Sequence, residues 1–464
     1  MRPGLFIQAG LVGHDREESL RLIGNLLPSS IVLVRKDFSD RSDLLELIHS
    51  IKRLYKIEKD TRYPYIAVDQ EGGNVVRLPF LNYNPSNAFL GNLNNECFTE
   101  YVGSRTGYDL NSLGIDWNLA PVLDLSSPYN QVILERSFSY DPLIVAAHGR
   151  AFIRGIQSYG VAATGKHFPG HGGVLGDSHL MLPKDGRGFG ALKSDMLPFQ
   201  EAVKERVSSI MISHVLYTSI DEAYPATLSP AIYNMLRKEL GFKGLAVTDS
   251  LNMKAVSKDF STEEMAKRAS RAGADILECV DIDRAMEMSQ YLDIKDEHAS
   301  VERIIHLLPE KKAIIEPPGD VLNAFALIGN STRKQYTPLD PESRTAILFL
   351  DDTRESIVGD SFTNSRGIIK RLKETGLRLD NFTSEDPETS YNGYEQLIVI
   401  GRNEHLKERY TKIIDLMESR KSIFISTGVP ADLGLFPLNT GYISAFSTKV
   451  EAILGAVFRA FGYF

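Results

Sequence analysis

Cysteine is scarce in this chain of 464 residues, because only Cys97 and Cys279 occur, far apart and without C-x-x-C spacing. The pattern argues against a framework of disulfide bonds and against a zinc site built from cysteines. Positive charge is also in deficit, with 52 lysines and arginines against 60 acidic residues and a net charge of −8. A protein whose main task is to bind nucleic acid or anionic lipid needs a cationic surface, so neither partner is expected.

Long apolar runs are missing as well. No run reaches the length of about 18 residues that a membrane-spanning helix needs. The N-terminus, which begins Met1–Phe6, has no charged region followed by a long apolar run and a small-residue cleavage site, as a signal peptide would have. We therefore expect no membrane span and a cytoplasmic location. The sequence leaves the oligomeric state open.

Short apolar segments alternate with helical patterns over the first 300 residues. Their apolar residues run continuously, as in parallel strands that are buried on both faces. The eight predicted strands are Leu5–Gln8, Ile31–Val34, Tyr65–Asp69, Ile115–Asp124, Val161–Lys166, Ser209–His214, Gly244–Asp249 and Asp275–Val280. Eight successive βα units predict an α/β fold of the (β/α)8 TIM type, although periodicity alone leaves a doubly wound sheet as the competitor.

Three regions of the chain are expected. Residues 1–310 form the barrel, which would carry the catalysis, and residues 311–344, rich in proline, form a linker. Residues 345–464 resume the alternation and predict a small α/β sandwich domain. Its predicted strands are Thr345–Leu350, Leu397–Gly401, Ser422–Ser426 and Tyr442–Phe446, and a helix over Val450–Phe461 is expected to follow.

Polar residues gather where the predicted barrel strands end. In a barrel, the carboxyl ends of the strands form the face that carries the active site. The residues at or just after these ends are Asp69, Arg77, Arg136, Lys166, His167, His171, Asp177, His179, His214 and Asp249. Such a convergence predicts one site on this face of the barrel.

A metal site is the first alternative to weigh, because His167 and His171 have the i, i+4 spacing of a helical zinc pair. The residues between them include Pro169 and Gly170, which do not continue a helix, so no metal is expected. We interpret His171 as a structural residue. For His214 the structural and functional interpretations remain equally open.

Asp249 ends an apolar strand without a basic neighbour in sequence, which is typical of a carboxylate with a partner or a chemical task. Asp177 and His179 form a second feature, because a carboxylate beside an imidazole fixes its tautomer and raises its pKa. A carboxylate together with a proton donor indicates transfer of a glycosyl group to water.

The motifs at these positions resemble glycoside hydrolase family 3, and within it the β-N-acetylglucosaminidases of the NagZ type. They are AVDQEGGNVVRL (67–78), GIDWNLAPVLDL (114–125), ERSFSYDP (135–142), GKHFPGHG (165–172), GDSHLMLP (176–183), IMISHV (210–215) and VTDSLNM (247–253). The pair KHFPGHG and DSH is the most specific. A stretch GVPADLGLFP (428–437) resembles the second domain of two-domain members.

The resemblance assigns roles residue by residue. It implies that Asp249 is the nucleophile of a retaining enzyme, and that His179 is the general acid/base with Asp177 as its partner. Residues that match positions at the sugar subsite are Asp69, Arg77, Arg136, Lys166, His167 and Met253, and His214 is added to this group as a candidate. No cofactor is implied.

The expected activity is release of terminal GlcNAc from a small carbohydrate, either a peptidoglycan fragment in recycling or a chito-oligosaccharide. Rival interpretations on the same scaffold are a GlcNAc-glycoside phosphorylase and a β-glucosidase or β-xylosidase. A sugar-binding barrel without catalysis is a rival from another class.

Overall fold

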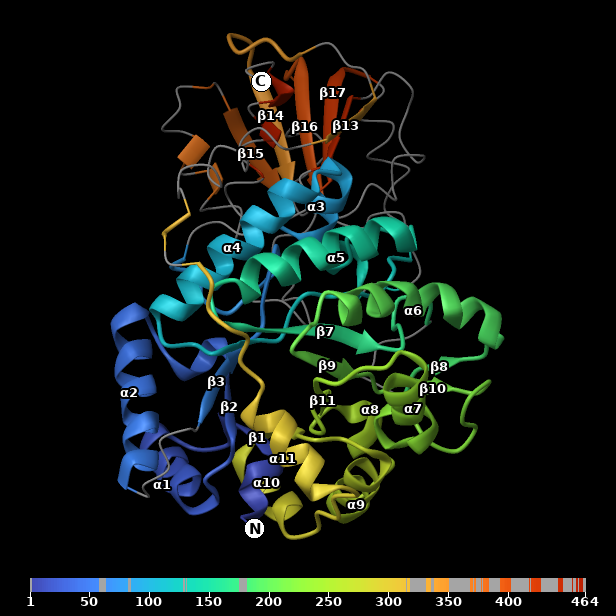
Figure 1. The fold of residues 1–464 in the computed structure, drawn as a ribbon. Coiled ribbons are helices and arrows are strands. Elements are labelled where there is room, and N and C mark those ends of the chain that lie inside the picture. Colours follow the sequence, from blue (N-terminus) through green and yellow to red (C-terminus); the bar gives the residue numbers. More distant parts are fainter. Residues whose placement is uncertain are drawn as a thin grey trace.

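The computed structural model describes residues 2–57, 64–81, 85–127, 130, 132–174, 182–313 and 315–317, and parts of the segment from 331 to 461. Its larger part is a closed ring of eight parallel strands surrounded by helices (Figure 1). The strands are β1 (Ile7–Val12), β2 (Ser30–Leu33), β3 (Tyr65–Val68), β6 (Trp117–Asn118), β7 (Ala162–Phe168), β9 (Ser209–Ile212), β11 (Leu245–Thr248) and β12 (Leu277–Asp281).

The hydrogen-bonded order of the strands is β11-β9-β7-β6-β3-β2-β1-β12. A parallel bridge between Val247 on β11 and Ile276 on β12 joins the two ends of this order and closes the barrel. All eight predicted strands are therefore present, and the (β/α)8 prediction is confirmed over the doubly wound sheet.

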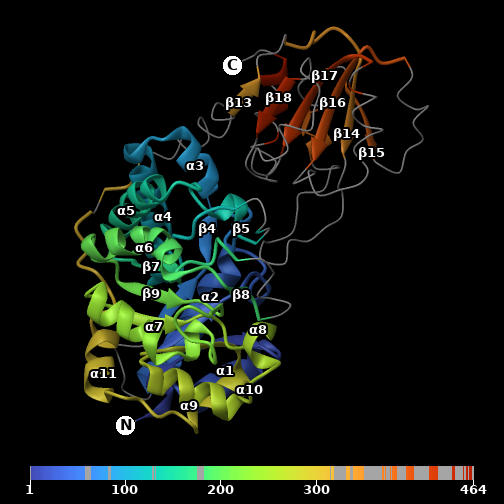
Figure 2. The same cartoon turned by 90° about the vertical axis from the view of Figure 1, so that its right-hand side faces the viewer.

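Helices follow the strands and cover the outside of the barrel (Figures 1 and 2). They are α1 (Arg16–Leu26), α2 (Arg41–Ile57), α3 (Asn87–Leu93), α4 (Glu96–Ser112), α5 (Pro142–Gln157), α6 (Phe189–Lys204), α7 (Pro230–Asn234), α8 (Lys254–Ser257), α9 (Thr262–Ala272), α10 (Ile282–Ser289) and α11 (Glu297–Ile305). Among the described residues, no helix is long and apolar enough to cross a bilayer.

Two predicted strand limits were wrong. The segment predicted as Leu5–Gln8 begins as a short 3-10 helix, Pro3–Phe6, so β1 starts only at Ile7. The strand predicted over Ile115–Asp124 pairs regularly only at Trp117 and Asn118, with one further bridge between Val122 and Lys166. Pro121 interrupts it, because proline has no N–H to give to a neighbouring strand.

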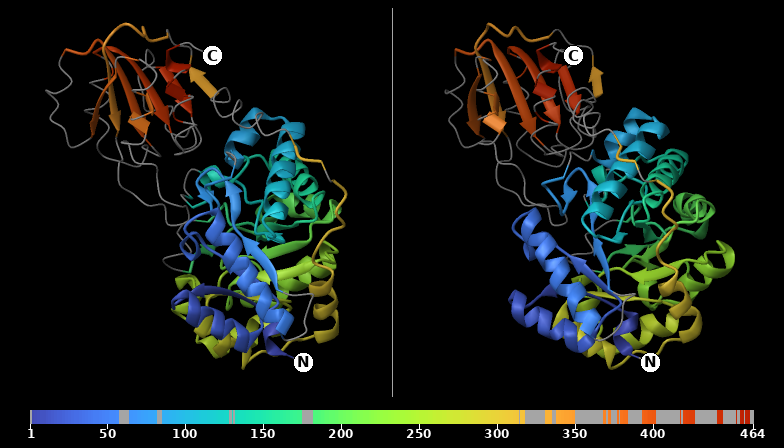
Figure 3. Two further views of the ribbon diagram at one scale, coloured as in Figure 1. Left: turned by 90° about the vertical axis from the view of Figure 1, so that its left-hand side faces the viewer. Right: turned by 60° about the vertical axis from the view of Figure 1, so that its left-hand side comes forward.

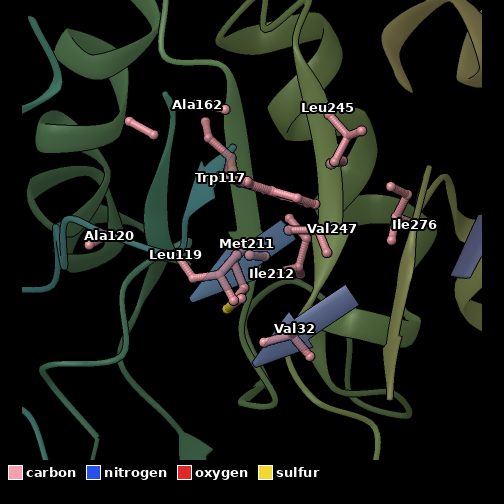
Figure 4. Packing of buried hydrophobic residues seen from close by; sticks show 14 of the residues in the cluster. Val32, Trp117, Leu119, Ala120, Ala162, Met211, Ile212, Leu245, Val247 and Ile276 are labelled. Atoms are coloured by element: carbon pink, nitrogen blue, oxygen red, sulfur yellow. The ribbon is translucent and has the colours of Figure 1, made fainter. Parts of the chain in front are cut away.

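The barrel is filled by side chains from alternate positions of its strands. The indole of Trp117 extends toward Leu245 and Val247 (Figure 4). Its Nε1 donates to the hydroxyls of Thr164, at 2.7 Å, and Ser209, at 3.0 Å. This part of the barrel is thus a packed core, and the cavity lined by strand ends lies on their carboxyl side.

The second described sheet, orange to red in Figure 3 and labelled in Figure 2, has six strands in the order β13-β18-β17-β16-β14-β15. All of its pairs except β13 with β18 are parallel. The strands are β13 (Ser331–Lys334), β14 (Thr345–Phe349), β15 (Leu379–Thr383), β16 (Gln396–Gly401), β17 (Lys421–Ser426) and β18 (Gly441–Ser444). The predicted small α/β domain is confirmed.

Three further predictions about this region have different outcomes. Strand β13 falls inside the predicted linker 311–344, so part of that segment belongs to the second sheet. Residues 453, 456–457 and 459–460 of the predicted helix over Val450–Phe461 are helical. The stretch 428–437 lies outside the described residues, and the division of the chain at 310 and 344 stays a prediction.

Candidate active site

A cavity of about 280 Å³ opens at the carboxyl ends of the barrel strands. Side chains from nearly every strand end line it, as the barrel geometry predicts. The lining includes four carboxylic residues and three cationic ones, together with apolar side chains on the β2 and β12 side. These residues are Asp69, Glu71, Asp249 and Glu278; Arg77, Arg136 and Lys166; and Val34 and Val280.

One side of the cavity carries a connected network of charges. Lys166 Nζ lies 2.8 Å from Asp69 Oδ1 and 2.6 Å from Glu71 Oε1. Arg136 donates to both oxygens of Glu71 at 2.9 Å, in the two-pronged geometry that suits a guanidinium and a carboxylate. Arg77 lies 3.7 Å from Asp69 Oδ2. We define Asp69, Glu71, Arg77, Arg136 and Lys166 as the paired wall.

The charges of the paired wall hold one another in their ionised forms. Burial by itself would favour neutral Glu71, but the charges of Arg136 and Lys166 outweigh it and keep the pKa of Glu71 below its ordinary range. Burial likewise disfavours charged Lys166, yet Asp69 and Glu71 raise its pKa. Glu71 and Lys166 therefore remain charged near neutral pH.

Asp124 organises the loop that follows β7. Its carboxylate accepts from His167 Nδ1 at 2.7 Å and from the backbone N–H of His171, also at 2.7 Å. His167 and His171 both line the cavity. Burial lowers the pKa of His171 to about 4, so its ring is neutral at neutral pH. The structural interpretation of His171 agrees with these contacts.

Glycines let this loop pack closely. A side chain at Gly172 would collide with the backbone carbonyl of Leu125, and one at Gly173 would collide with the guanidinium of Arg187. Arg187 is itself bound by Asp185 and Asp195. The chain is thus held firmly up to Val174, the last described residue before the segment that carries Asp177 and His179.

Asp249 lies at the end of β11 on the opposite side of the cavity. Its backbone N–H donates to the carbonyl of Ile212, and its Oδ1 accepts from the N–H of Ser250 at 2.7 Å. Burial by itself would raise its pKa, but the charges of His214 and His167 outweigh burial and leave the pKa lowered. Asp249 is therefore ionised, and no ion pair to it occurs among the described residues.

His214 sits beside Asp249 but is not among the lining residues. Its Nδ1 lies 2.7 Å from Thr227 Oγ1, and its Nε2 lies 3.0 Å from the carbonyl oxygen of Ser250. A carbonyl only accepts, so Nε2 carries a proton. The ring holds the backbone that follows Asp249, and the predicted contact of His214 with sugar stays a prediction.

The cavity gathers most of the residues predicted from sequence. Those that line it are Asp69, Arg77, Arg136, Lys166, His167, Asp249 and Met253. Asp177 and His179 lie outside the described residues, so their predicted partnership remains a prediction. No group of three or more histidine, cysteine or acidic side chains that could hold a metal occurs within the described part of the chain.

Sequence reasoning missed Asp124 and Glu278 as site residues and treated Glu71 as merely architectural. Asp124 gave no signal of its own, because the histidines that it binds lie more than 40 positions away in sequence. Glu278 did give one: it is the charged residue inside the apolar run Ile276–Val280. A buried charge in a strand of this kind is a candidate site residue.

Comparisons with known proteins show the family of the chain. The family model described as "Glycosyl hydrolase family 3 N terminal domain" matches residues 7–307. A β-hexosaminidase of Methylococcus capsulatus is 38% identical over 255 residues, which are 53% of this chain and 74% of that protein. A β-hexosaminidase of Neisseria meningitidis is 35% identical over 315 residues, 64% of this chain and 85% of that protein.

Solved structures extend the likeness to the second domain. A family 3 β-N-acetylglucosaminidase from Paenibacillus superposes with a TM-score of 0.89 at 25% identity, covering 99% of this chain and 96% of that one. NagZ of Neisseria gonorrhoeae, in complex with N-trifluoroacetyl-D-glucosamine, has a TM-score of 0.59 at 30% identity over 68% of this chain and 93% of its own. The chain therefore belongs to glycoside hydrolase family 3 and is a glycoside hydrolase.

Proposed function

We propose that this chain is a retaining exo-β-N-acetylglucosaminidase that releases terminal GlcNAc through a covalent glycosyl–Asp249 intermediate. The observation that carries the proposal is the state of Asp249. Its carboxylate is ionised, faces a sugar-sized cavity and has one oxygen held by the N–H of Ser250. The other oxygen is available to attack, and the substrate named for the Paenibacillus enzyme supports GlcNAc as the sugar.

The first step forms a bond between Asp249 and the anomeric carbon while the glycosidic C–O bond breaks. The leaving oxygen takes a proton from His179, which Asp177 orients. In the second step His179 takes a proton from water, the water oxygen bonds to the anomeric carbon, and Asp249 leaves as a carboxylate. Two displacements on the same carbon give net retention of configuration.

In the proposed complex, the paired wall binds the hydroxyl groups of the sugar. Asp69 has an oxygen 3.7 Å from Arg77, and Lys166 is held between Asp69 and Glu71. Sugar hydroxyls both donate and accept hydrogen bonds, so they can bridge such ionised groups without a change of net charge. Charge-assisted hydrogen bonds of this kind orient the sugar with its reacting carbon toward Asp249.

The proposed natural substrate is a small carbohydrate with a terminal GlcNAc. A terminal GlcNAc on a peptidoglycan fragment or on a chito-oligosaccharide fits an exo-acting pocket, and a cytoplasmic enzyme of this kind would serve in recycling. Comparing hydrolysis of a GlcNAc–anhydro-muramic acid fragment with that of chitobiose tests this choice. A higher kcat/KM for the first compound assigns the enzyme to peptidoglycan recycling.

The reaction itself is tested with nitrophenyl glycosides and product analysis in phosphate buffer. Free β-GlcNAc as the first product, seen by NMR, is the expected result. GlcNAc-1-phosphate would instead identify a phosphorylase, and a preference for glucosides or xylosides would overturn the choice of sugar. Absence of any turnover would favour a sugar-binding barrel.

The role of His179 is tested through the leaving group. His179→Ala should slow glycosylation much less for an activated aryl glycoside than for a disaccharide, because a good leaving group needs little protonation. Equal losses on both substrates would contradict proton donation by His179.

A further inference from the structure

Glu278 is a buried acid in the cavity that the proposed mechanism does not use. It lies on β12, only 5% exposed, and lines the cavity together with Val280 two positions further on. Alternate residues of a strand face the same side, and Ile276 on this face pairs with Val247 of β11. Glu278 therefore faces the barrel interior, next to the strand that ends in Asp249.

The pairing of β11 and β12 changes at this level. The N–H of Glu278 donates to the side-chain hydroxyl of Thr248, and its carbonyl accepts from Leu251 rather than from Ser250. The N–H of Ser250 donates instead to the side-chain Oδ1 of Asp249. Asp249 and Glu278 are consequently carried by neighbouring strands, whose backbones are about 5 Å apart in a sheet.

Glu278 has no ion-pair partner among the described residues. Lys166 and Arg136 are bound by the carboxylates of the paired wall. Burial, and then the negative charges of Asp69 and Asp249, raise the pKa of Glu278 well above its ordinary value. Lys166 and Arg77 act in the other direction but do not outweigh these effects.

Gln8 on β1 is the direct neighbour of Glu278 in the strand register. Its Nε2 donates to Ser30 Oγ at 2.8 Å, and Ser30 Oγ in turn donates to the carbonyl of Tyr65. This chain of bonds fixes the orientation of the amide. Within the part of the chain that the structure describes, Gln8 Oε1 and Glu278 Oε2 are both buried without a hydrogen-bond partner.

One proton shared between Gln8 Oε1 and Glu278 Oε2 would give both oxygens a hydrogen bond. Two buried acceptor oxygens on adjacent strands are costly when unpaired, but a carboxylic acid O–H on Glu278 can donate to Gln8 Oε1. Since Oε2 is sealed from solvent while the residue lines the cavity, the other carboxyl oxygen is the one that can meet a ligand. That oxygen then accepts a hydrogen bond.

We propose that Glu278 is a neutral, substrate-binding acid that shares its proton with Gln8 and accepts a hydrogen bond from an uncharged donor beside the reacting carbon of the sugar. This inference rests on the proposed glycosidase function. Two groups flank the reacting carbon and offer such a donor: the acetamido N–H on one side and the hydroxymethyl O–H on the other. Glu278 would help the pocket to select a sugar that carries the donor.

The test compares Glu278→Gln with Glu278→Leu on the aryl glycoside that the unmodified protein hydrolyses best. A glutamine amide donates to Gln8 and still offers a carbonyl oxygen, so kcat/KM near neutral pH should stay within about threefold. Leucine removes the acceptor and leaves Gln8 unpaired, so kcat/KM should fall roughly tenfold or more. Thermal melting checks that both variants are folded.

The pH profile separates a binding role from a packing role. Ionisation of Glu278 would break its bond to Gln8 and add a negative charge beside Asp249, so activity should fall on the alkaline side. The Glu278→Gln profile should lack this fall. An activated aryl glycoside is used because it depends least on proton donation by His179, and Glu263→Gln, on the exposed face of α9, serves as the matched control.

Substrate analogues identify the donor. The penalty of Glu278→Leu should shrink toward unity either for the 6-deoxy sugar or for the 2-O-acetyl sugar, in which oxygen replaces the amide N–H. The inference is overturned if glutamine and leucine are equally damaging, if the alkaline fall persists in Glu278→Gln, or if neither analogue reduces the penalty. A protein that hydrolyses no glycoside would instead refute the proposed function.

Discussion

The two sides of the cavity balance their charges in opposite ways. On the paired wall, Lys166 and Arg136 neutralise Asp69 and Glu71 through contacts of 2.6 to 2.9 Å. On the side of β11 and β12, the contacts of Asp249 that the structure describes are a backbone N–H and nearby histidines, and no ion pair to Glu278 occurs among the described residues. Ionic pairing fixes a group in place, whereas chemistry needs a carboxylate that has not been neutralised.

This contrast predicts whether substitutions on each side of the cavity reduce stability or turnover. Substitutions on the paired wall should act first on stability, because they leave a buried charge without its partner. Substitutions at Asp249 should act on turnover and leave the fold intact. A paired-wall variant that lost only turnover, or an Asp249 variant that lost stability, would contradict this division.

The largest effect is expected for Asp249→Asn. The variant loses the nucleophile, so kcat on an aryl GlcNAc glycoside should fall on the order of 10⁴-fold or more. Its melting temperature should not decrease, because asparagine still accepts from Ser250 and removes a buried charge. Asp293→Asn, at an exposed ion pair with Arg271, is the control and should keep full activity. Retention of more than about 1% of activity by Asp249→Asn would remove it as nucleophile.

Glu71→Gln should produce the largest loss of stability. It removes the carboxylate that pairs with buried Arg136 and leaves Lys166 with Asp69 alone, and breaking a buried pair in this way costs about 3–5 kcal/mol. Because the folded pKa of Glu71 lies below its ordinary value of 4.5, the stabilisation is present above that pH and fades as the pH falls below it. Denaturant unfolding of both proteins at pH 7 and at acidic pH measures the difference.

Glu18→Gln is the comparison for that experiment, since Glu18 forms an exposed i, i+3 pair with Arg21 on α1. Exposed pairs of this kind contribute little to stability. Should Glu71→Gln be as harmless as Glu18→Gln, the paired wall would not be the rigid element that the contacts indicate.

His171 predicts a smaller, pH-dependent effect. Its pKa falls from 6.5 to about 4 on folding, so the unfolded chain takes up the proton first and stability declines as the pH drops from 6.5 toward 4. Between pH 7 and pH 5 this residue should account for about 2 kcal/mol of lost stability. His171→Gln should remove that part of the slope, and His306→Gln, at a 76% exposed side chain, is the matched control.

The sequence predicted the barrel well because its signal is repeated eight times, and each apolar strand supports the same topology. It also predicted which polar residues converge, since residues after parallel strands share one face of a barrel. It predicted limits less well where one residue overrides the pattern, as at Pro121, which interrupts the fourth predicted strand.

Pairings within the site were beyond the sequence, because they depend on distances between residues far apart in the chain. His214 was placed among the sugar-binding candidates, yet its partners Thr227 and Ser250 are 13 and 36 positions away and occupy both ring nitrogens. The same limit hid Glu278, whose character depends on Asp69, Asp249 and Gln8 from three other strands. A residue type at a strand end predicts a site, but its partners decide its charge.

Ser250→Ala should have the smallest effect of all, and it tests whether the backbone N–H of Ser250 alone positions Asp249. The contact that holds the nucleophile comes from the backbone N–H of Ser250, which alanine keeps. The Ser250 hydroxyl is buried and has no hydrogen-bond partner among the described residues, so its loss removes an unsatisfied polar atom. We expect kcat/KM within about twofold of the unmodified protein and an equal or slightly higher melting temperature. A tenfold loss of kcat would mean that the hydroxyl takes part in the reaction, and that the backbone contact alone does not position Asp249.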